Sequence, residues 1–148
     1  MFGFFKKRAH FDDEKQQQFV EAIATMLEVQ MVVSGSCIEN AVGTINPKAL
    51  GYIYGFIDAA LRTIGQDMSD NSIGIPVTFQ ILRRLFSGRE EKYLAYLAER
   101  MGTDQVVTIA AMTGGQQYID FHNKKVSGPM GLARYILERG NSPSGQLD

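Results

Sequence analysis

Residues 46–66 read NPKALGYIYGFIDAALRTIGQ, a stretch that combines clear helix signals with two internal glycines. Asn46 suits an N-cap, and Pro47 suits the first helical position, where a missing N–H costs nothing. At about 100° per residue, one side of this helix is apolar; it carries Leu50, Ile53, Ile57, Ala60, Leu61 and Ile64. The pattern predicts an amphipathic helix that ends near Gly65, a suitable C-cap.

The opposite side of this helix is a glycine face, formed by Gly51, Gly55, Asp58 and Arg62 within an arc of roughly 60°. Each mid-helix glycine destabilises by about 1 kcal/mol relative to alanine. We therefore expect another helix, a second copy of the chain or a ligand to approach this backbone closely. Asp58 and Arg62 also fit an ordinary i,i+4 ion pair. Two adjacent glycines at positions 114 and 115 suggest an alternative, in which two glycine-bearing helices of the same chain cross each other.

The helical period continues through most of the chain, and no stretch shows sustained alternation of apolar and polar residues. Residues 104–122 are apolar on more than one side, which predicts a central helix. The polar segment 66–74 reads as the longest internal loop, and 36–42 as a short helical turn. Further helices are expected at 13–33, 76–86, 89–101 and 129–139.

These elements predict an all-α fold, a single-domain irregular orthogonal bundle of about six helices, over residues 12–140. Residues 1–11 are expected to form a loose or docking N-terminal tail. Residues 141–148, rich in glycine, serine and proline, are expected to be disordered.

Composition argues against several classes of protein. With 15 basic and 16 acidic residues the formal charge is −1, which disfavours a nucleic-acid partner. Cys37 is the only cysteine, so no internal disulfide or cysteine-based zinc site can form, and we expect it to be buried. His10 and His122 lie in no metal-binding spacing. We therefore predict no metal site, although motif searching does not test an all-carboxylate one. No motif for nucleophilic catalysis is present either, so we assign no catalytic residue and no cofactor.

Two charged segments are candidate contact sites. A basic cluster around residues 87–88 is either a solvated face or a site for an anionic partner; it comprises Arg83, Arg84, Arg89 and Lys92. The first eight residues, MFGFFKKR, combine aromatic and cationic side chains that suit a membrane surface. Those candidate membrane contacts are Phe2, Phe4, Phe5, Lys6, Lys7 and Arg8.

We expect a cytoplasmic location, because no secretory signal and no run of about 20 apolar residues is present. The leading functional hypothesis is a non-enzymatic interaction protein that forms a homodimer or binds a protein partner through the glycine face. One alternative is a ligand-binding or catalytic domain centred on Asp58, with loop 66–74 as a lid. Another is a peripheral membrane protein held by its N-terminal segment.

Overall fold

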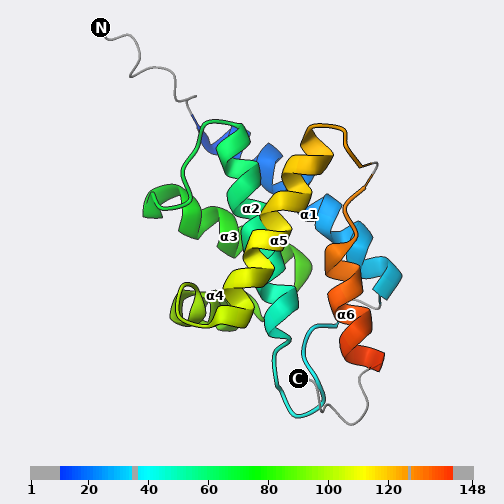
Figure 1. The fold of residues 1–148 in the computed structure, drawn as a ribbon. Helices are drawn as coiled ribbons and strands as arrows, with labels where there is room; N and C mark the ends of the chain where they lie inside the picture. The colour runs from blue at the N-terminus through cyan, green and yellow to red at the C-terminus, as the bar shows by residue number, and fades with distance from the viewer. Residues whose placement is uncertain (1–10, 35–36, 127, 142–148) are drawn as a thin grey trace, which may run out of the picture.

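The computed structural model describes residues 11–34, 37–126 and 128–141, and this part of the chain forms an all-α bundle (Figure 1). Six helices follow one another in the described residues, which confirms the predicted fold class. They are α1 (Asp13–Ser34), α2 (Pro47–Thr63), α3 (Asn71–Leu85), α4 (Glu90–Arg100), α5 (Gln105–His122) and α6 (Gly131–Asn141).

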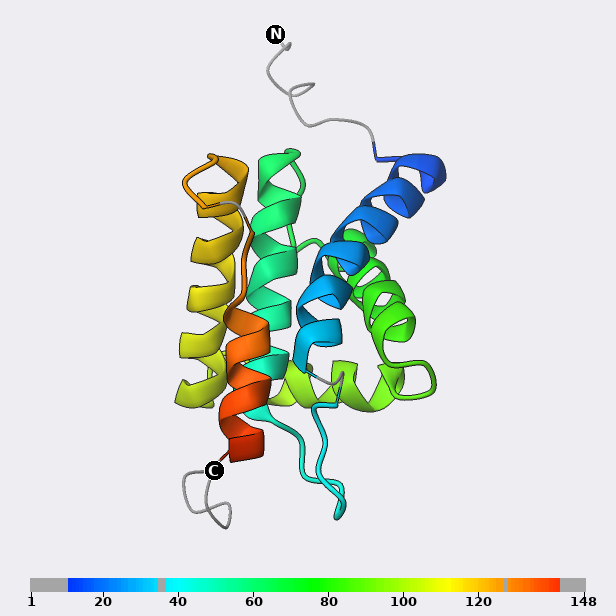
Figure 2. The same cartoon turned by 90° about the vertical axis from the view of Figure 1, so that its right-hand side faces the viewer.

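Helix α2 is the centre of the bundle. Of its 17 residues 11 are buried, on both the apolar side and the glycine face. Figure 2 shows α5 beside α2 with nearly parallel axes, α1 crossing obliquely, and α4 lying crosswise at one end. The prediction that residues 104–122 form the central helix was wrong. Helix α5 packs against α2 through small residues and leaves its other side exposed, with Ile109 54% and Met112 68% accessible.

Local caps explain most helix boundaries. The Asn46 side chain accepts a hydrogen bond from the Ala49 N–H at 3.1 Å, as its N-cap position predicts. Helix α2 ends where Gly65 takes φ +79° and the Gln66 N–H reaches back to the Leu61 carbonyl oxygen at 3.0 Å. This 6→1 bond is typical of a Schellman ending.

Two segments differ from their predicted structure. Helix α3 begins at Asn71 rather than at Pro76, because Asp70 caps it by accepting from the Ser72 N–H at 3.0 Å. Half of the predicted 66–74 loop is therefore helix, and Pro76 lies inside α3. Residues 37–45 form a strap rather than a helical turn. An isolated antiparallel bridge joins Glu39 to Ile45, and Ile38 is buried.

The N-terminus of α6 is held by glutamine side chains of two other helices. Gln117 Oε1 accepts from the Gly131 N–H at 2.9 Å and from the Tyr52 hydroxyl at 2.7 Å. Gln30 Oε1 accepts from the Leu132 N–H at 2.9 Å. Long-range side chains thus satisfy N–H groups that the helix cannot pair by itself. Burial raises the pKa of Tyr52 to about 12, so its hydroxyl stays a donor at neutral pH.

Candidate functional site

The glycine face packs against α5 of the same chain. A methyl group built on Gly55 would lie 2.7 Å from Ala111 Cα and still closer to the Ala111 carbonyl oxygen. One built on Gly51 would lie 3.1 Å from Ala110 Cβ. Gly114 is placed in the same way against the Tyr52 backbone. The close approach predicted for Gly51 and Gly55 is therefore real, and the approaching element is α5.

This packing gives the two glycines a structural role within the chain, as in the alternative of two crossing glycine-bearing helices. Gly51 and Gly55 are buried, and the positions where their Cβ atoms would lie are occupied by the α5 backbone. The backbone of Gly55 also forms part of the lining of a groove between α2 and α5. Asp58 and Arg62 remain accessible at the edge of the α2–α5 contact, with 33% and 64% of their side chains exposed. Of the four residues of the predicted contact surface, Gly51 and Gly55 are thus buried, Asp58 is half-buried and Arg62 is exposed.

Asp58 and Arg62 line a groove of about 430 Å³ between α2 and α5. Their side chains pair at 3.4 Å, one helical turn apart. Partial burial raises the pKa of Asp58, while the Arg62 guanidinium acts in the opposite direction. The rest of the lining is mainly apolar or backbone and includes Tyr54, Gly115 and Met112.

The outer side of α5 continues from this groove. Val106, Ile109 and Met112 are 45%, 54% and 68% exposed, and we call these three residues the α5 face. No charged residue occurs between Asp104 and Asp120 in the sequence. Sequence reasoning missed this surface because an apolar residue on a predicted central helix is expected to be buried.

The predicted basic cluster is divided among three separate contacts. Arg84 pairs with Glu21 and Glu28 of α1. Arg83 lies over the Phe79 ring, 5.4 Å from its centroid. Arg89 and Lys92 instead approach the carboxylate of Glu39, which comes from the 37–45 strap. The four cations therefore do not form one continuous basic patch.

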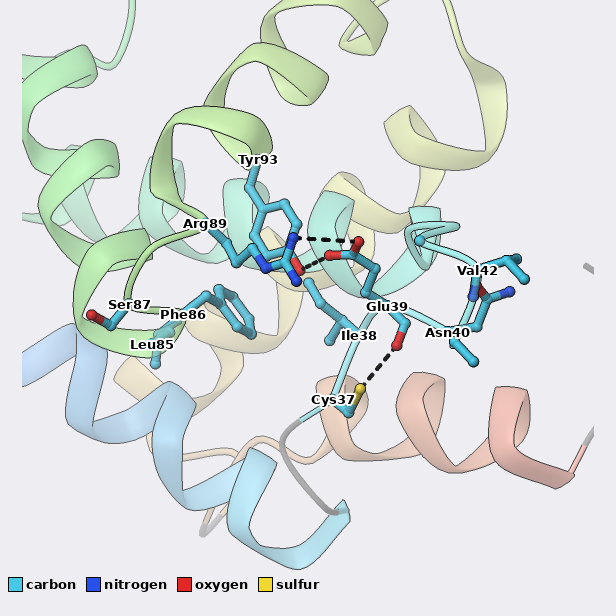
Figure 3. A pocket seen from close by; sticks show the side chains of 12 residues that line it. Cys37, Ile38, Glu39, Asn40, Val42, Leu85, Phe86, Ser87, Arg89 and Tyr93 are labelled. Carbon is cyan, nitrogen blue, oxygen red and sulfur yellow. Dashed lines mark hydrogen bonds and ion pairs between the residues drawn. The ribbon is translucent and has the colours of Figure 1, made fainter.

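Glu39 is at the centre of the most polar arrangement around a pocket of about 560 Å³ (Figure 3). Its Oε1 accepts from the Tyr93 hydroxyl at 2.6 Å, and its Oε2 accepts from Lys92 Nζ at 2.6 Å. Arg89 NH1 lies 3.7 Å from the same Oε2. The Lys92 and Tyr93 hydrogen bonds hold the pKa of Glu39 below its ordinary value. Burial, and then the Glu39 hydrogen bond, raise the pKa of Tyr93.

Sequence reasoning identified the two cations of this arrangement but not Glu39 or Tyr93. Helices α2 and α3 and the first turn of α4 separate residue 39 from residue 93 in the sequence, so no local spacing connects them. Cys37 lies on the same strap and is exposed, contrary to the prediction of a buried thiol. Its Sγ donates to the Glu39 carbonyl oxygen at 2.9 Å.

The remaining candidates lie outside these two sites. The predicted membrane contacts at residues 2–8 fall outside the described residues. Within the described ranges, no group of three or more His, Cys, Asp or Glu side chains is arranged to hold a metal ion. None of the helices described is long and apolar enough to cross a membrane.

Comparison of this chain with protein-family models, with curated proteins and with solved structures gave no match.

Proposed function

We propose that this chain is a non-enzymatic interaction protein that associates with a second copy of itself through the α5 face. The proposal keeps the self-association predicted from the sequence but moves the contact from the buried glycines to the outer side of the same helix pair. A cytoplasmic location is part of the proposal.

The observation that carries it is the lack of charge on an exposed helix. Fifteen consecutive residues, 105–119, contain no Asp, Glu, Lys or Arg, although α5 lies at the surface. Interface cores are depleted of charged residues and enriched in methionine and aromatic side chains. Met112 belongs both to the α5 face and to the neighbouring groove, which also contains Tyr54 and Met101. The two surfaces are therefore continuous.

A second copy is the occupant that suits this surface best. In a two-fold contact, residues at the axis meet their own counterparts, so a charge there would face a like charge. Val106 and Met112 lie three residues to either side of Ile109. An antiparallel pairing of two α5 helices centred on Ile109 would place Val106 of each copy against Met112 of the other. Asp58 and Arg62 would then lie at the rim, where polar groups are tolerated.

The proposal is tested by placing a charge at the centre of the α5 face. Ile109→Glu should lower the sedimentation coefficient to that of a monomer, because it brings two carboxylates together at the axis. Ile75→Glu is the matched control, since Ile75 is 49% exposed on α3, a different helix. Equal association of both variants would reject the α5 face as the contact.

A second candidate function is small-ligand binding in the Asp58 groove. It is favoured by a half-buried carboxylate beside a 430 Å³ groove that α5 and α2 line together. A thermal-shift screen of metabolites and divalent ions tests this alternative. A ligand of this groove should stabilise the wild-type chain and not Asp58→Asn, whereas a flat screen on folded protein would count against it.

A further inference from the structure

Three side chains at the start of α4 converge on one carboxylate. Lys92 and Tyr93 each donate to a different oxygen of Glu39 at 2.6 Å, and Arg89 adds a guanidinium at 3.7 Å. Two cations therefore surround a single anion, in a region that also includes the positive end of α4. We call Arg89, Lys92 and Tyr93 the carboxylate site.

We propose that the carboxylate site is a receptor for an acidic segment of a partner protein, that Glu39 occupies it in the free chain, and that the partner displaces Glu39. The Glu39 side chain and the turn that follows it in the strap would then be released from α4. Glu39 is in this respect an internal ligand that competes with an external one. This inference concerns a different surface from the α5 face and does not depend on self-association.

The accessibility of the two cations supports binding from outside. Arg89 is 55% and Lys92 44% exposed, whereas the Glu39 side chain is only 11% exposed. A carboxylate arriving from solvent can therefore contact both cations before Glu39 leaves. The open pocket of about 560 Å³ beside Glu39, visible in Figure 3, provides the space for that approach.

The strap has hydrogen bonds of its own that do not involve α4. Asn40 holds its turn together, because its Oδ1 accepts from the Val42 N–H at 3.0 Å and from the Thr44 N–H at 2.8 Å. The Asn40 N–H donates to the Thr44 carbonyl oxygen at 3.0 Å. Val42 at the turn is 85% exposed. These bonds lie within the strap, so they survive when Glu39 and the turn leave α4.

Release of Glu39 also has an opposing cost. Ile38 is 2% and Ile45 9% exposed, so the two ends of the strap are anchored in the core. An internal carboxylate competes at the high effective concentration of a tethered group. A single external carboxylate is thus a weak competitor. A segment with several acidic residues competes better, because its linked carboxylates raise the local concentration of carboxylate at the site. The ligand class that suits the site is therefore an acidic peptide segment.

The first arm of the test uses the wild-type chain and its single cysteine. Cys37 is exposed on the strap, and its alkylation by uncharged iodoacetamide reports on the strap's environment. Hexaglutamate peptide at low salt should raise the alkylation rate several-fold, while hexaglutamine peptide should leave it unchanged. An unchanged rate with hexaglutamate would overturn the proposal that an acidic segment displaces Glu39.

The second arm tests whether the site accepts a carboxylate that is not tethered. Glu39→Ala vacates the site and should lower the thermal midpoint of the full chain. Acetate should then recover a large part of that loss, and chloride at equal ionic strength should not. The same acetate should have no effect on Glu39→Ala combined with Lys92→Gln. Equal effects of acetate and chloride on Glu39→Ala would refute a carboxylate site.

Discussion

Replacing Gly55 by alanine should destabilise the chain strongly, although helix propensity alone favours the change. Alanine is better than glycine inside a helix by about 1 kcal/mol. At Gly55, however, the new methyl group would lie 2.7 Å from Ala111 Cα and closer still to the Ala111 carbonyl oxygen. The obstructing atoms are backbone, so the helices must separate. Overpacking of this kind costs about 1–3 kcal/mol or more.

Because the obstructing atoms are backbone, we take the overpacking cost at the upper end of its range, about 3 kcal/mol. Subtracting the propensity gain of about 1 kcal/mol leaves a net loss of about 2 kcal/mol in the free energy of unfolding. For a chain of this length that corresponds to a thermal midpoint lower by about 4–8 °C. One added methyl group changes the surface exposed on unfolding very little, so the loss should appear as a lower urea midpoint with an unchanged m-value.

Gly115→Ala is the matched control. Gly115 lies across the same contact, but a methyl group there would meet its nearest neighbour, the Gly55 carbonyl oxygen, at 3.3 Å and Ala59 Cβ at 3.7 Å. A shift of a few tenths of an ångström accommodates it, so the propensity gain offsets most of the cost. We expect Gly115→Ala to lie within about 1 kcal/mol of the wild type.

Urea unfolding followed by far-ultraviolet circular dichroism measures both variants. We expect Gly55→Ala to be less stable than Gly115→Ala by about 2 kcal/mol. If Gly55→Ala is as stable as the wild type, the close approach of α5 to the glycine face is wrong.

Two further predictions concern single side chains. Asp104 caps α5 by accepting a hydrogen bond from the Val106 N–H at 2.9 Å, so Asp104→Ala should lower the free energy of unfolding in urea by about 1 kcal/mol. Asp104→Asn can still cap the helix and should keep most of the stability. Equal losses in the two variants would contradict the cap. Glu39→Gln should destabilise the chain at neutral pH, because the folded-state pKa of Glu39 lies below the ordinary value of 4.5. The contribution of ionised Glu39 to stability is complete above pH 4.5 and is lost as the pH falls through the folded-state pKa. The urea midpoints of wild type and Glu39→Gln should therefore converge on acidification. A difference between the midpoints that widens at low pH would contradict the lowered pKa of Glu39.

Local signals predicted the helices well. The cap at Asn46 with Pro47 set the start of α2, and the low tolerance for glycine inside a helix predicted a close contact on the correct face. Both inferences depend on residues a few positions apart. The start of α3 was misplaced because Pro76 was taken as a first-turn residue, although Asp70 and Ser72 form the real cap.

Features that depend on the arrangement of helices were harder to predict. Small residues on α5 allow it to pack tightly on α2 while its larger apolar residues face outward, so apolar content gave the wrong central helix. The contact of Glu39 with Lys92 and Tyr93 joins segments that only the folded chain brings together. The helical spacing of apolar residues in the sequence therefore predicted neither the α5 face nor the carboxylate site.

The molar mass of the full-length chain, measured by light scattering over a wide range of concentrations, tests the central claim most directly. Self-association through the α5 face predicts a mass that rises towards twice the 16.5 kDa of one chain. The same rise should occur for Ile75→Glu and be absent for Ile109→Glu. A wild-type mass of 16.5 kDa at every concentration would contradict self-association.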